Sequence, residues 1–280
     1  MKRKTTIITV SIACTIIAFI IIVNAVITLN GKYNKAVELI DKGNIVKAYE
    51  ILVTLGGYRD SEDKANSIYF EYEVEKLKTA EPGDHVFFGK YEQDNDTSNG
   101  KENIEWYVLD KQDNKVFVLS EYALDCKPYN TSDTTVTWES CTLRKWLNKG
   151  FIKSAFSAAE RAMIPTVNVD NKLKWSKTED VTQDKVFLLS STEIRDKYHV
   201  IGPCEATAYA IANGVWVYDA GFLDWRSGQC KWWLRSPSFF AEHIVNIAGI
   251  GGEIYGDTSG ENICRGDRGV RPAIWIELDK

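Results

Sequence analysis

Two arginines in the C-terminal third of the chain have the clearest capacity for chemistry. Arg235 lies in the sequence Trp-Trp-Leu-Arg-Ser-Pro at residues 232–237, and Arg271 lies in Val-Arg-Pro at residues 270–272. A guanidinium has five N–H donors, so it can bind an anionic ligand or hold several loop carbonyls together. Both arginines fall in or beside expected strands, which favours the second role. The residues to which we assign a structural role are Trp232, Trp233, Arg235, Arg271 and Trp275.

An aromatic-rich segment on either side of residues 232–237 is the candidate ligand surface. It begins near Trp216 and Tyr218 and mixes aromatic side chains and arginine with small polar residues. That composition is typical of protein or glycan recognition. The alternative is that about half of these aromatic residues complete a small, irregular core. The predicted ligand-binding residues are Trp225, Arg226, Phe239, Phe240, His243, Tyr255 and Asp257.

Motifs that carry catalysis are not found in the sequence. The three histidines, His85, His199 and His243, are scattered, and no HExxH, GxSxG or P-loop motif occurs. No CxxC pair occurs either, so neither a zinc ribbon nor a thioredoxin-like site is indicated. Residues 265–267 spell the adhesion tripeptide Arg-Gly-Asp, for which a tight turn is a sufficient explanation. We therefore expect a non-catalytic protein with no cofactor and no bound metal.

The charge of the chain argues against nucleic acid as a partner. The 280 residues carry 34 basic and 39 acidic side chains, which gives a net charge of −5. Lys2, Arg3 and Lys4 lie together at the N-terminus, so the remainder of the chain is more acidic still. An acidic surface repels a phosphate backbone.

The N-terminal segment predicts a membrane anchor. An uncharged, apolar run covers residues 7–29 and follows the basic residues 2–4. At about 1.5 Å per residue this run is long enough to cross a hydrocarbon core of about 30 Å, and the positive-inside rule places the N-terminus in the cytoplasm. The prediction is a single-pass protein of the cell membrane that contacts the membrane through residues 7–29 and has its C-terminal domain outside. A cleaved signal peptide and a lipoprotein signal at Cys14 are the alternatives.

Three regions follow from the patterns along the chain. Residues 1–29 form the basic tip and the anchor, residues 30–79 form a helical stalk, and residues 80–280 form a ligand-binding domain. The stalk has apolar residues at helical spacing on both sides of a turn at Gly43, and it resembles a tetratricopeptide-type helical hairpin. It would act as a spacer or as the assembly surface of a structural envelope component. An ordinary helical linker is the alternative.

The third region has strand-like stretches at both ends and helix-like stretches between them. Asp113 and Asn114 predict a hairpin turn, and capping-box patterns start at Ser157 and Ser190. Residues 94–103 are polar and loop-like. This order predicts an α+β domain whose terminal strands meet. The expected strands are residues 85–91, 106–110, 115–120, 186–189, 232–235, 244–247, 253–255 and 270–277.

Five motifs in order carry a resemblance to a known family. They are TWESCTLRKWLNKGF from residue 137, AFSAAERAMI from 155, KVFLLSSTEI from 185, WWLRSP from 232 and GVRPAIWIEL from 269. As a set they resemble an uncharacterised bacterial domain family, frequent in Firmicutes, that we associate with the C-type-lectin-like superfold near the formylglycine-generating enzymes. The resemblance covers residues 81–278. It implies a C-type-lectin-like domain in which short antiparallel sheets and two helices support a long, irregular segment that presents ligands.

Two activities of that superfold can be compared with the sequence. Calcium-dependent sugar binding uses Glu-Pro-Asn or Gln-Pro-Asp together with Trp-Asn-Asp, and none of these is present. Formylglycine-generating enzymes use a reactive cysteine pair, and Cys204 and Cys230 could approach each other, although neither lies in a matching motif. The expected function is a membrane-anchored, extracytoplasmic binding protein that recognises a protein or a glycan. The alternative is an oxidoreductase of the formylglycine-generating type, with a close cysteine pair that binds copper.

The oxidation state of the cysteines is left open by the sequence. Five of the six cysteines lie outside the expected anchor, and their odd number leaves at least one without an intramolecular partner. An exterior location would permit disulfides, whereas buried thiols act as small hydrophobic side chains. The five residues concerned are Cys126, Cys141, Cys204, Cys230 and Cys264.

Overall fold

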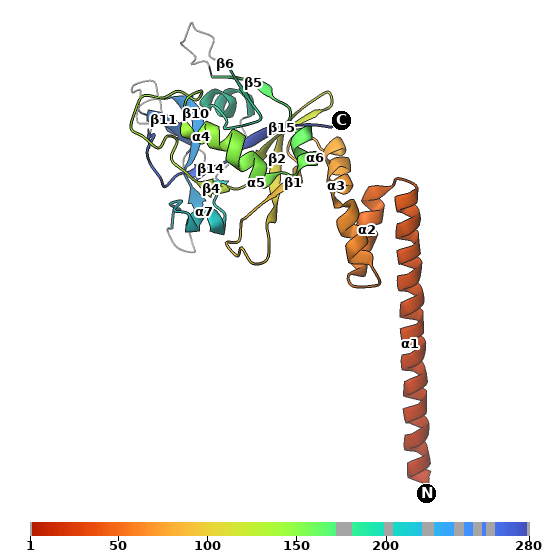
Figure 1. Ribbon diagram of the computed structural model, residues 1–280. Helices are drawn as coiled ribbons and strands as arrows, with labels where there is room; N and C mark the ends of the chain where they lie inside the picture. Colours follow the sequence, from red (N-terminus) through yellow and green to blue (C-terminus); the bar gives the residue numbers. More distant parts are fainter. Residues whose placement is uncertain are drawn as a thin grey trace. The chain divides into compact units, whose positions relative to one another are not determined.

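A computed structural model describes most of the chain. The described residues are 2–171, 181–198, 204–219, 227–237, 244–248, 254–255 and 261–278. The chain divides into two compact units, Met1–Lys76 and Leu77–Lys280, and each is described by itself (Figure 1).

The N-terminal unit is helical. Gly43 ends the first helix with a φ of 72°, a left-handed conformation that glycine adopts without a steric cost, and its N–H donates to Ile40 O. Ala36 and Ala48 are fully buried together with Leu52, so small side chains allow the first two helices to approach closely. The helices are α1 (Lys2–Asp41), α2 (Ile45–Leu55) and α3 (Ser61–Thr79).

The predicted membrane anchor is wrong. Within the residues that the structure describes, no helix has the length and apolar character needed to span a membrane. The transmembrane helix at residues 7–29, the single-pass topology and the placement at the cell membrane are therefore corrected.

The first sheet of the C-terminal unit brings the two ends of that unit together. Its order is β1-β2-β3-β15-β7, and all neighbouring strands are antiparallel. β2 and β3 form the predicted hairpin, and Asp113 in its turn has a left-handed φ of 52°. The last strand inserts between β3 and β7 and places Trp275 opposite Phe117. The strands are β1 (His85–Tyr91), β2 (Glu102–Gln112), β3 (Lys115–Ser120), β7 (Val186–Phe187) and β15 (Ala273–Glu277).

The second sheet has the Trp-Trp-Leu-Arg-Ser-Pro sequence at its centre. Its order is β12-β11-β10-β14-β4, with β13 paired separately to β11. β10 and β14 run parallel, and the other described pairs are antiparallel. The strands are β4 (Asp125–Cys126), β10 (Trp232–Pro237), β11 (Ile244–Ala248), β12 (Ile254–Tyr255), β13 (Glu261–Asn262) and β14 (Gly269–Val270).

Short helices and two small ladders complete the C-terminal unit, which is α+β with short antiparallel sheets. The predicted capping boxes are confirmed. Ser157 and Glu160 exchange side chain to backbone hydrogen bonds, and so do Ser190 and Glu193. The elements are α4 (Thr142–Trp146), the π-helical turn η1 (Leu147–Phe151), α5 (Ile152–Ala155), α6 (Ala158–Met163), β5 (Val167–Asp170), β6 (Val181–Asp184), the π-helical turn η2 (Glu193–Tyr198), β8 (Cys204–Glu205), α7 (Ala208–Ala212) and β9 (Gln229–Cys230).

Candidate functional site

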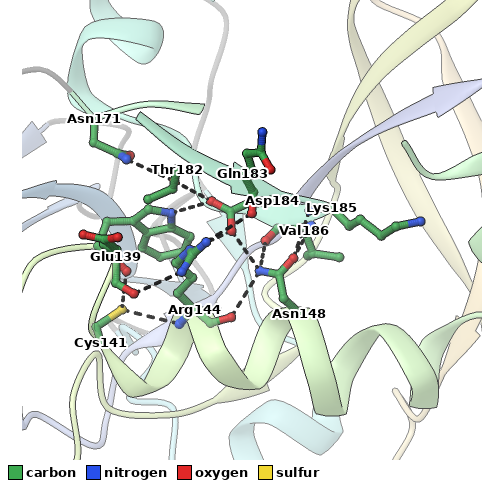
Figure 2. A network of polar contacts seen from close by, with 11 residues as sticks. Glu139, Cys141, Arg144, Asn148, Asn171, Thr182, Gln183, Asp184, Lys185 and Val186 are labelled. Atoms are coloured by element: carbon green, nitrogen blue, oxygen red, sulfur yellow. Dashed lines mark hydrogen bonds and ion pairs between the residues drawn. The ribbon is translucent and has the colours of Figure 1, made fainter. Parts of the chain in front are cut away.

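Asp184 is the centre of a buried polar network that joins α4 to β6 (Figure 2). The residue is 1% exposed. Oδ2 accepts from Trp138 Nε1 at 3.0 Å and from Thr182 Oγ1 at 2.7 Å. Oδ1 accepts from Arg144 Nε at 2.6 Å and from Asn148 Nδ2 at 3.4 Å. Every donor around this carboxylate is thus supplied by the protein itself.

The outer ends of the same network bind backbone groups. Arg144 donates to the carbonyls of Glu139 and Gln183 at 3.0 and 3.1 Å. Asn148 donates to Val186 O at 2.8 Å and accepts from Val186 N at 3.2 Å, so its amide acts as an extra pairing partner for β7 (Figure 2). The Thr-Trp-Glu-Ser-Cys motif and the residues that follow it therefore connect α4 and η1 to β6 and β7 by hydrogen bonds.

Arg235 is held at the junction of three segments. The residue is 2% exposed and forms a two-point ion pair with Glu193, at 2.5 and 2.9 Å. Its two Nη atoms also donate to Leu188 O at 2.7 Å and to Asp170 O at 2.9 Å. Glu193 uses the same carboxylate to cap the turn that begins at Ser190. Arg235 therefore organises loops in the described structure rather than facing solvent.

Arg271 occupies a second buried position beside Trp232. Its Nε donates to Ser120 O at 2.7 Å, and its guanidinium carbon lies 5.1 Å from the centre of the Trp232 ring. Trp232 and Trp233 are fully buried, and Trp233 Nε1 donates to Lys127 O at 2.8 Å. Trp275 is partly buried and stacks on Phe117, with the ring centres 4.8 Å apart.

Cys204 and Cys230 lie directly opposite each other on β8 and β9, and both are fully buried. Burial opposes ionisation of Cys204, but the hydrogen bond from Cys230 and the nearby Arg271 guanidinium lower the pKa of Cys204. The same hydrogen bond, together with burial, raises the pKa of Cys230. Gly269 permits this close packing, because a Cβ there would lie 2.7 Å from Ala123 Cβ and 3.2 Å from Cys230 Sγ.

The other described thiols are poor nucleophiles. Burial raises the pKa of both Cys126 and Cys141 to about 11. Cys141 is fully buried and caps α4 by accepting from Arg144 N at 3.4 Å. Cys264 is partly exposed, and its pKa is also raised, by desolvation and by Asp133.

Most of the predicted ligand-binding residues lie outside the described residues. Tyr255 belongs to β12, opposite Ile247 of β11. The assignment of these seven residues to a ligand surface stays a prediction. Those outside the described residues are Trp225, Arg226, Phe239, Phe240, His243 and Asp257.

Trp216 is the largest exposed aromatic side chain in the described part of the C-terminal unit. It is 48% exposed, and Tyr218 contacts it edge to face with ring centres 6.4 Å apart. Its backbone N–H donates to Asp267 O at 3.1 Å, and Tyr218 N–H donates to Gln229 O at 2.8 Å. The backbone that carries the exposed ring is therefore held by hydrogen bonds at both Trp216 and Tyr218. We call Trp216, Tyr218 and the adjoining turn at Arg265 and Asp267 the tryptophan patch.

The charged side of the tryptophan patch is an ion pair. Arg265 donates from Nε and Nη2 to the two Asp267 oxygens at 3.0 and 2.6 Å. Burial alone would raise the pKa of the Asp267 carboxyl, but Arg265 and Arg268 hold it below its usual value. Since the arginine and the aspartate of the Arg-Gly-Asp sequence bind each other, the turn explanation fits this sequence better than an adhesion motif.

Sequence reasoning missed the residues that organise these buried contacts. Asp184, Arg144 and Asn148 were not singled out, and Glu193 was recognised only as a cap. The arginine partners of Asp184 and Glu193 lie about forty residues away, so local spacing holds no sign of them. The available signal was the placement of Arg144 and Asn148 four residues apart on one helical face.

The fold and the site define an α+β domain whose motif residues are buried and whose described aromatic surface is the tryptophan patch. Residues 113–278 match the model of a family described as Domain of unknown function (DUF6273). The match covers more than half of the chain, and the chain belongs to this family. No curated protein and no solved structure matches the chain, so the relation to the C-type-lectin-like superfold stays a prediction.

Proposed function

We propose that the C-terminal unit is a non-catalytic binding module that recognises a glycan through Trp216. The carrying observation is the exposure of this ring, 48%, on a backbone that is hydrogen-bonded at both Trp216 and Tyr218. A large aromatic face with a fixed backbone offers contact area at a low ordering cost on binding.

A glycan fits this surface better than a protein partner does. A stable protein interface buries about 800 Å² on each side and is organised around several apolar anchors. Among the described side chains, Ile211 is the exposed large hydrophobic residue nearest to Trp216 in the sequence. A sugar ring needs less apolar surface, since its C–H face can stack on one tryptophan while its hydroxyls bind charged groups such as those of Arg265 and Asp267.

The state of the motif residues supports a role without turnover. Asp184, Arg235 and Cys204 are the side chains best suited to act in a reaction, and all three are buried among protein partners. A nucleophile or general base must come within hydrogen-bond reach of a substrate, which buried groups cannot do without an opening of the fold.

The test is a glycan array probed with the full chain, followed by titration of any glycan that binds. We expect binding that Trp216→Ala weakens at least about tenfold, since loss of one stacked aromatic contact removes more than about 1.4 kcal/mol. Phe87→Ala is the matched control, because Phe87 is also an exposed aromatic residue, at 40%, and lies on β1. Equal binding by the Trp216 variant, or capture of protein instead of glycan, would reject the proposal.

A second candidate is a thiol oxidoreductase similar to the formylglycine-generating enzymes. One observation favours it, namely the direct opposition of Cys204 and Cys230 beside Arg271. Complete burial of both thiols weakens it. The affinity for Cu(I), measured by competition with a chelator, tests this candidate. If the thiol pair binds copper, Cys204→Ser should lower the affinity, whereas the control Cys264→Ser should keep the affinity of the wild-type chain.

A further inference from the structure

Three carboxylates gather where β1 ends and β2 begins. One oxygen from each of Glu92, Asp94 and Glu102 lies within 4.8 Å of the other two. This acidic group lies N-terminal to the residues that match the family and shares no residue with the tryptophan patch. The sequence predicted only a polar loop over residues 94–103.

The loop between Glu92 and Glu102 is folded tightly around these acids. Asp94 accepts from Asp96 N at 2.8 Å and from Asn99 Nδ2 at 2.7 Å. Glu102 Oε2 accepts from Gln93 N at 2.6 Å and from Asp94 N at 3.3 Å. These contacts hold two of the three carboxylates in place, but they do not neutralise the charge of the group.

Glu92 is the residue that this arrangement leaves unexplained. It is only 8% exposed, and its Oε1 is buried with no hydrogen-bond partner. The Glu92 carboxyl is hydrogen-bonded to the Asp94 side chain and to the Asn95 backbone, but its Oε1 has no donor, and a buried acceptor without a partner is destabilising. Burial, followed by the charges of Glu102 and Asp94, raises the pKa of Glu92. Lys101 directly precedes Glu102 in the sequence, but its ammonium group binds Ser154: it donates to Ser154 O at 2.6 Å and to Ser154 Oγ at 3.1 Å.

We propose that Glu92, Asp94 and Glu102 bind a calcium ion. Carboxylate oxygens are the ligands that hard divalent cations prefer, and a cation would supply the partner that the buried Glu92 oxygen lacks. The three oxygens lie within 4.8 Å of one another, so one cation can contact all of them, and Ca²⁺ takes six to eight oxygen ligands in a flexible geometry that three carboxylates and water can supply. Mg²⁺ requires near-ideal octahedral geometry, keeps several of its waters and is usually bound through only one or two carboxylates, so a group of three carboxylates favours Ca²⁺.

The surroundings of the group favour a fixed site rather than a loose acidic surface. Gln93, which lies between two of the ligands, accepts from Tyr209 N at 2.9 Å, at the start of α7. Asn95 adopts a left-handed φ of 67°, and Gly100 has a φ of 100°, so the loop turns twice over a short stretch. The site uses none of the tripeptides of calcium-dependent sugar binding, which the sequence lacks.

The experiment is isothermal titration calorimetry of the full chain, stripped with EDTA, with CaCl₂ at neutral pH and physiological salt. We expect one site with a Kd between about 1 μM and 1 mM, a higher Tm with calcium, and weaker binding of MgCl₂. Glu92→Gln should weaken calcium binding at least about tenfold and abolish the Tm shift. Asp113→Asn, which removes an acid from an exposed turn, should leave both unchanged.

The behaviour without calcium separates a metal site from a merely structural carboxylate. Glu92→Gln removes the like-charge repulsion of Glu92 by Glu102 and Asp94, so in EDTA this variant should be at least as stable as the wild-type chain. Asp94→Asn provides a second ligand variant if Glu92→Gln fails to fold. No calcium heat from the folded wild-type chain would overturn the proposal. Equal affinity of wild type and both ligand variants, or equal binding of Mg²⁺, would also overturn it.

Discussion

The substitution Asp184→Asn should destabilise the C-terminal unit by about 3 kcal/mol. An asparagine can present its oxygen to only one side of the network, so it leaves either Arg144 and Asn148 or Trp138 and Thr182 facing an NH₂ group. Two buried donors without an acceptor cost about 1–3 kcal/mol each, and removal of the partner of a buried cation costs about 3–5 kcal/mol. We take the lower end of this range, because the Arg144 side chain is 21% exposed and water can reach its outer end.

Urea unfolding followed by tryptophan fluorescence measures this loss in the full chain. All nine tryptophans lie at residue 106 or later, so the signal comes from the Leu77–Lys280 unit alone. Asp113→Asn is the control, because it makes the same aspartate-to-asparagine change in an exposed turn, and it should shift the free energy of unfolding by less than about 0.5 kcal/mol. Arg144→Met should cost much less in the Asp184→Asn background than in the wild-type chain, since the two residues act as a pair. A loss below about 1 kcal/mol for Asp184→Asn, or additive losses in the double variant, would refute the role given to this network.

Two further predictions concern packing and thiol access. Gly89→Ala should cost about 3 kcal/mol in the same unfolding assay, because Gly89 has a φ of 75° and a Cβ there would lie 2.5 Å from the Phe156 ring. Gly100→Ala, with a φ of 100° and open space around it, should cost only about 1–2 kcal/mol, and equal losses would contradict the packing argument. At about pH 8, iodoacetamide should modify the partly exposed Cys264 at least about ten times faster than Cys204, whose burial outweighs its lowered pKa. Equal rates in peptide mass mapping would show that the buried thiol pair opens to solvent.

Local sequence patterns predicted local structure well. The hairpin at Asp113 and the caps at Ser157 and Ser190 depend on residues within a few positions of one another, and all three are present. The α+β composition follows from the same kind of pattern. The membrane anchor was also a local interpretation, drawn from hydropathy alone, and the described helices do not support it.

Contacts between distant segments were beyond the reach of those patterns. Arg144 meets Asp184 from forty residues away, and Arg235 meets Glu193 from forty-two. Nothing in the spacing of these residues identifies the partner, because the pairing is created when the strands assemble. The buried oxygen of Glu92 is a similar case, since acidity is visible in a sequence but burial without a partner is not. The site residues predicted around Phe239 lie outside the described residues, so that part of the ligand surface stays a prediction.

The shortness of the strands explains why so many polar side chains are buried in this unit. β4, β7, β8, β9 and β14 contain two residues each, so backbone ladders supply few of the hydrogen bonds that hold the segments together. Arg235, Asn148 and Trp233 supply the missing ones by donating to backbone carbonyls of neighbouring segments. Substitution of such a residue would remove ligand binding together with the fold, whatever the ligand. Only a residue such as Trp216, whose side chain faces solvent, can separate recognition from folding, and variants there should be made first.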